Sequence, residues 1–190
     1  MTFNALSPRS AGKRGKHICV YALFDNEEVG SATNQGAGAT FLKNTLTRIS
    51  RSLGYSYDET QAMIAQSFMI SADNGHALHP NHGEYADPVN APRLNEGIVI
   101  KFNAQQKYAT DGFSAAFFRD LCRRAKVPTQ TFTNRSDIPG GSTLGNISNT
   151  KVSMPTVDIG LPQLAMHSSY ETAGTKDTAY LVMACTAFFE

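Results

Sequence analysis

Short apolar runs rich in β-branched and aromatic residues alternate along this chain with longer stretches of helical character, and this alternation restricts the fold more than any other feature. The short runs predict strands at residues 17–24, 68–71, 99–102, 129–133 and 156–158. The longer stretches predict helices at residues 33–53, 58–67, 112–125, 142–150 and 177–189. Strands that alternate with helices are typical of a sheet covered by helices. We therefore expect an α/β fold.

The chain divides into a polar lead-in and a single domain. Residues 1–15 are rich in Ser, Gly, Lys and Arg, which is typical of a terminal segment outside the packed fold. Residues 16–190 contain no repeat, low-complexity segment or long linker, so they form one domain in this interpretation. Asp58 followed by Gln61 predicts a capping box at the start of the second helix, and Pro128 favours the end of the third.

The charge balance excludes two classes of partner. The formal net charge is +1 and the sequence pI is about 7.7, so no strong field attracts nucleic acid or an anionic membrane. The apolar runs are far shorter than the roughly 20 residues that a membrane-spanning helix needs. The basic N-terminal residues are not followed by a cleavage site of small residues, which argues against a signal peptide.

The three cysteines are scattered and odd in number. Cys19, Cys122 and Cys185 show no CxxC spacing, which argues against a disulfide framework. We expect reduced thiols buried in the core, and a cytoplasmic location.

Polar residues of unusual type follow three of the predicted strands. A run of acidic residues, 25–28, follows the first, Asp73 follows the second, and His167 lies shortly after the last. Ligands bind at the carboxyl ends of strands in open α/β sheets, so these side chains are expected to converge in one crevice. Carboxylates and imidazoles are ligands for zinc, manganese or cobalt. A metal site is the natural inference.

The two adjacent glutamates are suited to different roles. In an extended backbone Glu27 and Glu28 point to opposite sides, so one can bind a metal ion while the other takes a proton from water. Each residue also has an ordinary interpretation, since the glutamates can form a solvated acidic turn, Asp73 a turn residue before Asn74-Gly75, and His167 a hydrogen-bonded core histidine.

Two glycine-rich passages need separate interpretation. Gly36-Ala37-Gly38 lacks the third glycine of a dinucleotide fingerprint and favours close helix packing. Gly140 and Gly141 precede a predicted helix without the lysine of a phosphate-binding loop. Their backbone N–H groups form either a cradle for a carbonyl oxygen or an ordinary turn.

Five motifs, taken together and in order, resemble the aspartyl aminopeptidase family of dinuclear zinc metallopeptidases. They are FDNEEVGS at 24–31, SADNGH with HPN at 71–81, IKFN at 100–103, SDIPGGST at 136–143, and DIG through QLAMHS at 158–168. The resemblance runs from about residue 16 to residue 189. It implies a three-layer α/β/α sandwich around a mixed, mainly parallel sheet, as in zinc exopeptidases.

The resemblance assigns roles to the residues that match. Glu27 would be the general base, Glu28 and His167 would bind one metal ion, and Asp73 the other. Two divalent ions are implied, zinc first, with cobalt or manganese as alternatives. A substrate pocket is implied near His79 and Lys101, where a cation could pair with an acidic N-terminal side chain. Tyr108 would hold the tetrahedral intermediate. The glycines Gly140 and Gly141 would complete the substrate-binding set.

The family pattern also contains a histidine ligand and a bridging aspartate upstream of the two glutamates, with an inserted β domain that builds oligomers. Nothing before Glu27 supplies those ligands, so we expect the C-terminal part of a catalytic domain. The resemblance implies an aminopeptidase that removes N-terminal residues, preferably Asp or Glu, and forms a homo-oligomer when complete. Two alternatives stay open, namely a non-catalytic module and an aminopeptidase of broad or neutral specificity.

Overall fold

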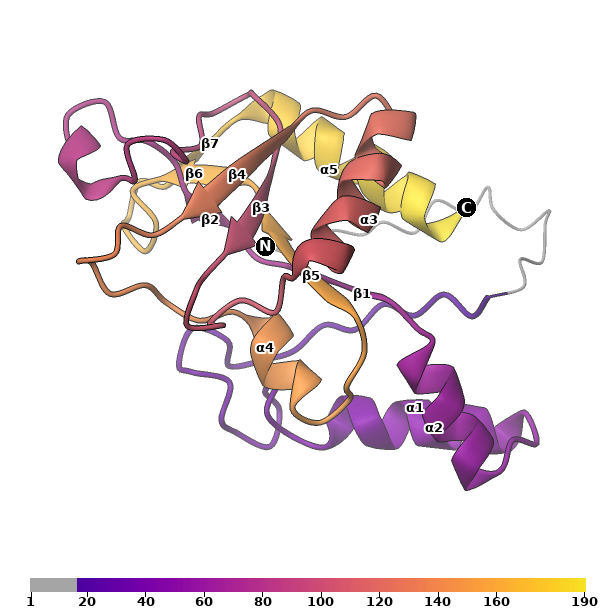
Figure 1. The fold of residues 1–190 in the computed structure, drawn as a ribbon. Helices are drawn as coiled ribbons and strands as arrows, with labels where there is room; N and C mark the ends of the chain where they lie inside the picture. Colours follow the sequence, from indigo (N-terminus) through magenta and orange to yellow (C-terminus); the bar gives the residue numbers. More distant parts are fainter. Residues whose placement is uncertain (1–16) are drawn as a thin grey trace.

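A four-stranded mixed sheet forms the centre of the computed structural model, which describes residues 17–190. Its strands are β1 (Met69–Ala72), β3 (Ile98–Phe102), β4 (Thr129–Thr133) and β5 (Thr156–Gly160). They lie in the order β1-β5-β3-β4 (Figure 1). β1 pairs with β5 and β3 with β4 in parallel, whereas β3 and β5 are antiparallel. The expected mixed, mainly parallel sheet is therefore confirmed, while the expected lead-in at 1–15 lies outside the described residues.

Helices cover both faces of this sheet. α3 (Gly112–Arg124) and α5 (Thr175–Phe189) pack on one face, and α4 (Leu144–Asn149) contacts β1 and β5 on the other (Figure 1). α1 (Phe41–Ser52) and α2 (Tyr57–Ala65) form a separate pair. The three-layer α/β/α arrangement follows. None of the helices within residues 17–190 is long and apolar enough to cross a membrane.

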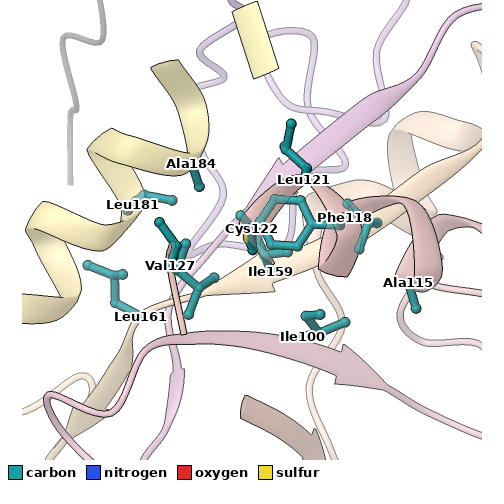
Figure 2. Packing of buried hydrophobic residues seen from close by; sticks show 12 residues of the cluster. Ile100, Ala115, Phe118, Leu121, Cys122, Val127, Ile159, Leu161, Leu181 and Ala184 are labelled. Carbon is teal, nitrogen blue, oxygen red and sulfur yellow. The ribbon is translucent and has the colours of Figure 1, made fainter. Parts of the chain in front are cut away.

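The main core lies between the sheet and the α3–α5 pair. Alternate residues of β3 and β5, including Ile100 and Ile159, face inward because successive strand side chains point to opposite faces (Figure 2). Phe118 of α3 is fully buried against them, with Leu181 from α5 alongside. The opposite face of the same strands carries Lys101 and Asp158 beside a smaller apolar cluster of Val99, Tyr108 and Phe132, and the candidate site lies on that side.

The helix starts differ from the sequence-based expectation in two places. α2 begins at Tyr57 with a capping box formed by Ser56 and Glu59, so the predicted Asp58–Gln61 box was wrong. Ser56 is the residue with extended backbone that can accept from the third helical N–H. α1 begins at Phe41 rather than at residue 33, because the N–H of Gly36 and that of Ala39 close two successive turns before it.

The predicted strand at residues 17–24 is also wrong. The segment is extended, but no strand in the described part pairs with it. Ala22 and Phe24 pack against the apolar cluster of α1 and α2, whereas Ile18 is 52% and Leu23 57% exposed. Cys19 is exposed as well, so its expected place in the core was wrong. A strand requires hydrogen bonds to a neighbour, and apolar β-branched composition alone does not supply one.

A small second sheet, which the sequence did not predict, extends the first. It contains β2 (Gly75–His76), β6 (Pro162–Leu164) and β7 (Thr172–Ala173), in the order β2-β6-β7. β2 follows β1 and β6 follows β5 along the chain. The two segments that leave the main sheet are therefore still paired in the small sheet. A short 3-10 helix, η2 (Gly83–Tyr85), lies in the loop after β2.

Candidate metal and catalytic site

The loop after residue 24 holds Glu27 and Glu28 in a turn with unusual backbone angles. Asn26 and Ser31 both have φ of 59°, a left-handed conformation that asparagine tolerates better than most residues. The N–H of Ser31 donates to the carbonyl of Asn26 at 2.9 Å, and that of Gly30 to Glu27 at 2.9 Å. A Cβ at Gly36 would lie 2.2 Å from the Ser31 carbonyl oxygen, so only glycine fits there. This packing fixes where the two glutamates stand.

Glu28 and His167 meet across the site. The Nε2 atom of His167 lies 2.8 Å from Oε2 of Glu28. His167 follows β6 in a tight turn with φ of 66°, and its N–H donates to Oε1 of Glu171 at 2.6 Å. Both side chains of the pair are well exposed, so solvent reaches this carboxylate–imidazole contact.

Glu27 is partly buried, whereas its neighbour Glu28 is exposed. Desolvation by burial raises the pKa of Glu27, and the charges of Asp73 and Glu28 raise it further. Lys101 and His167 oppose this rise. The three predicted metal ligands, Glu28, Asp73 and His167, are thus all near enough for their charges to act on Glu27.

Asp73 is held by a buried lysine. Nζ of Lys101 donates to Oδ2 of Asp73 at 3.1 Å and to the Asn74 carbonyl at 2.8 Å. Lys101 is only 2% exposed, and Nζ lies 5.6 Å from the centre of the Tyr108 ring. Burial, followed by the charges of Asp73 and Asp158, raises the pKa of Tyr108 to about 12, so its phenol stays protonated near neutral pH.

His76 ends the SADNGH motif, which gave it no role, and it lies near enough to this group for the charges of Lys101, His167 and Asp73 to act on it. It lies in β2, in register with Gln163 of β6. Desolvation and the charges of Lys101 and His167 lower the pKa of His76, which favours the neutral imidazole. Its spacing of three residues from His79 matches no metal motif, and the pairing of β2 with β6 is what places it beside the site.

His79 lies in a different group of side chains. Its ring stacks on that of His82, with centroids 5.1 Å apart, and its Nδ1 accepts from the Asn81 N–H at 3.2 Å. His82 in turn lies 3.1 Å from the Glu84 carboxylate. The contacts of His79 are therefore with the loop around η2 and not with Glu27 or Lys101.

The two glycines before α4 form a loop that approaches the Tyr108 segment. The carbonyl of Gly140 accepts from Nζ of Lys107 at 2.9 Å. A Cβ at Gly140 would lie 2.5 Å from the Asn134 side chain, whereas one at Gly141 would meet nothing within 4 Å. The loop is thus closely packed at Gly140 and open at Gly141.

The donor set fits zinc in type, and it is incomplete in number. Within residues 17–190, no group of three or more His, Cys, Asp or Glu side chains is arranged to hold a metal ion. Glu28 and His167 supply a carboxylate and an imidazole in contact, which are zinc ligands, and a catalytic zinc site has three protein ligands. Asp73 is engaged by Lys101. The described residues therefore provide part of a metal centre.

Comparisons with known proteins agree on one family. A family model described as aminopeptidase I zinc metalloprotease (M18) matches residues 2–189. The probable M18 family aminopeptidase 2 of Clostridium acetobutylicum is 50% identical over 170 residues, which is 90% of this chain and 39% of that protein.

Solved structures agree with the sequence matches. A chain in the cryo-EM structure of the Ape4 and Nbr1 complex superposes with a TM-score of 0.85 at 42% identity, covering 87% of this chain and 31% of that one. A chain of the S. cerevisiae mApe1 dodecamer has a TM-score of 0.76 at 30% identity, covering 87% and 36%. The chain spans about two fifths of the length of the curated relatives it matches, with 39% and 43% of two clostridial proteins covered.

Proposed function

Because the chain belongs to the aminopeptidase I zinc metalloprotease (M18) family, we propose that it carries the general base and part of the metal centre of a metallo-aminopeptidase. The complete enzyme would remove N-terminal residues from peptides, preferably Asp or Glu. It would bind two divalent ions, zinc first, form a homo-oligomer, and work in the cytoplasm. A dodecamer of a similar protein supports the oligomer, and the three free cysteines of the described residues, which form no disulfide, support the cytoplasmic location.

One observation carries this proposal, namely the contact between Glu28 and His167 with Glu27 beside it. A bound zinc ion would supply a water of lowered pKa and polarise the peptide carbonyl. Glu28 and His167 would hold that ion, and Asp73 would contribute to a second one. Since the described residues supply too few ligands for a closed site, further ligands would come from outside residues 17–190 or from another chain.

Glu27 would take the proton from the attacking water. A general base works best when its pKa is near the working pH, and the pKa of Glu27 is raised in that direction by desolvation and by Asp73. The protonated phenol of Tyr108 would donate a hydrogen bond to the oxygen that develops charge. The backbone N–H groups of Gly140 and Gly141 would donate to the substrate backbone.

The preference for an acidic N-terminal residue is assigned to Lys101 and, with weaker support, to His79. Lys101 is a buried cation at the site, which favours an anionic partner. Two of its three N–H groups are already donated to Asp73 and to Asn74, which leaves one for a substrate carboxylate. One alternative is an aminopeptidase with a broad preference or a preference for neutral N-terminal residues. The other alternative is a module without catalytic activity.

Zinc content and turnover separate these hypotheses. In the complete enzyme, Glu27→Gln should retain zinc with a similar KM while kcat falls by about 10²–10⁴-fold, because only proton transfer is lost. Glu28→Gln should release zinc. The exposed Glu96→Gln serves as the matched control, with zinc and kcat unchanged.

The isolated 190-residue chain should bind zinc weakly and hydrolyse aspartyl p-nitroanilide slowly. Calorimetric titration that found two tight zinc sites in it would contradict the incomplete metal centre. If Glu27→Gln lost zinc and Glu28→Gln retained it, Glu27 would be the metal ligand and Glu28 the general base. A complete protein that binds zinc and turns over no peptide would favour the non-catalytic module.

A further inference from the structure

Asp158 is a carboxylate with no solvent exposure in the middle of β5. Its strand neighbours Val157 and Ile159 face the apolar core, so its side chain lies on the opposite face, under α4. Its Oδ2 accepts from the backbone N–H of Ala109 at 2.5 Å, and its Oδ1 accepts from the Thr143 hydroxyl at 2.7 Å. A buried charge is costly unless such bonds satisfy it.

The two donors to Asp158 belong to two different loops. Ala109 lies in the loop between β3 and α3, directly after Tyr108, and Thr143 is the N-cap of α4, two residues after Gly141. The Thr143 hydroxyl makes no cap hydrogen bond within its own helix. It is turned to Asp158 instead, so one side chain from the sheet bridges both loops.

Other contacts join the same two loops. Nζ of Lys107 donates to the Gly140 carbonyl at 2.9 Å, and the Asn146 amide donates to the Gln106 carbonyl at 3.4 Å. The Asn146–Gln106 bond is exposed and the Lys107–Gly140 bond is partly buried, whereas the bond from Thr143 to Asp158 is fully buried. Gly145 lets α4 approach closely, because a Cβ there would lie 2.4 Å from Oδ1 of Asp158.

A second buried carboxylate provides a comparison. Asp177 of α5 is equally buried and accepts the backbone N–H groups of Asn95 and Gly97. It ties the start of α5 to the segment before β3 and contacts neither the Tyr108 loop nor the Gly140–Gly141 loop through these bonds. Asp177 therefore shares the burial and the hydrogen bonding of Asp158 but not its location.

We propose that Asp158 is a positioning residue that sets the distance between Tyr108 and the Gly140–Gly141 turn, so that the phenol and the backbone N–H groups face one substrate carbonyl group. This role rests on the proposed aminopeptidase function. Asp158 acts through Ala109 and Thr143 and does not itself touch substrate.

Amide hydrogen exchange on the chain, followed by NMR, tests this clamp without zinc or substrate. Asp158→Val fills the space but leaves both donors without an acceptor, so amide exchange at Ala109 and at residues 139–143 should accelerate by about 10–100-fold. Thr143→Val should accelerate only residues 139–143, and Thr143→Ser should restore protection because it keeps the hydroxyl. Asp158→Asn should also retain protection, since the Thr143 hydroxyl can rotate to accept from the new amide.

The Tyr108 ring carbon resonances are the second readout, because a change of loop position moves them. These resonances should shift in Asp158→Val. They should stay unchanged in Thr143→Ser and in the control Asp177→Asn. Asp177→Asn should instead accelerate amide exchange at residues 95–97. Unchanged exchange in both loops in Asp158→Val, or equal loosening of both loops in Asp177→Asn, would overturn the proposal. If Asp158→Val does not fold, the two substitutions of Thr143 test the proposal in its place. Equal protection of the amides of residues 139–143 in Thr143→Val and Thr143→Ser would then overturn the proposal. A failure of the proposed function appears separately, in zinc content and turnover.

Discussion

A glycine in the first turn of α4 allows a sharp test of how tightly Asp158 is packed. In most exposed helical positions, Gly→Ala stabilises a protein by about 1 kcal/mol, because alanine has the higher helix propensity. At Gly145 the added Cβ would lie 2.4 Å from Oδ1 and 2.6 Å from Oδ2 of Asp158, far inside ordinary contact. Either the carboxylate or the helix must move by about 1 Å.

Movement of the carboxylate breaks bonds that the buried charge depends on. Each hydrogen bond to a charged group contributes about 1.5–3 kcal/mol, and Asp158 accepts two, from Ala109 and from Thr143. If one or both are lost, the cost exceeds the propensity gain, and we expect Gly145→Ala to lower the free energy of unfolding by about 0.5–5 kcal/mol.

Urea unfolding followed by circular dichroism measures this difference. Gly112→Ala is the matched control, because Gly112 begins α3 and a Cβ there would meet nothing within 4 Å. It should leave stability unchanged or raise it by up to about 1 kcal/mol. A Gly145→Ala chain as stable as the Gly112→Ala chain would refute the tight packing of Asp158 against α4.

Three further predictions concern specificity, pH and thiol chemistry. In the complete enzyme, Lys101→Met should slow hydrolysis of N-terminal Asp and Glu far more than of neutral residues, whereas equal slowing of all substrates would assign Lys101 to holding Asp73 alone. Asp111→Ala should cost about 0.5–2 kcal/mol near neutral pH through loss of the α3 cap. Because the backbone N–H of Ser114 lowers the pKa of Asp111 below 3.8 in the folded chain, its contribution is present above that pH and lost in more acidic solution, so unfolding curves of the two proteins should converge there. Cys19 is exposed and should react first with a thiol reagent at pH 8. Burial raises the pKa of Cys122 to about 12, so Cys122 should react only when the chain unfolds. Equal reaction rates of the two thiols would contradict the packing of Cys122 in the core.

Elements with local signals were predictable from the sequence. β4 has the predicted bounds, because β-branched residues alternate there directly after Pro128. α3 agrees within one residue, since Asp111 caps its start and Lys126 follows with positive φ. The Ser56–Glu59 box was also readable as S-x-x-E, but Asp58 and Gln61 fit the same capping pattern two residues later, and the sequence alone does not rank the two.

Long-range pairing accounts for what the sequence did not predict. Residues 17–24 have strand composition, but no partner for them lies in the described part of the chain. His76 joins the site only because a two-residue strand pairs with β6. Likewise, nothing local indicates that Lys101 donates to Asp73, or that His167 contacts Glu28. The residue types of the site were recognisable, whereas their mutual contacts depended on the sheet.

The extended segment at 17–24, which pairs with no strand among the described residues, has the features of an aggregation-prone strand. It displays backbone donors and acceptors beside exposed Tyr21 and Leu23, and carries no Asp, Glu, Lys or Arg, the composition that promotes intermolecular strand pairing. The acidic residues that follow act as gatekeepers, because like charges would be brought together if two such segments stacked in parallel and in register. Glu28 would therefore both bind a metal ion and repel the same segment of a neighbouring chain, and the first role weakens the second. A cation bound there would weaken the repulsion that keeps neighbouring chains apart, and zinc would then favour the precipitation of any chain whose segment is left uncovered.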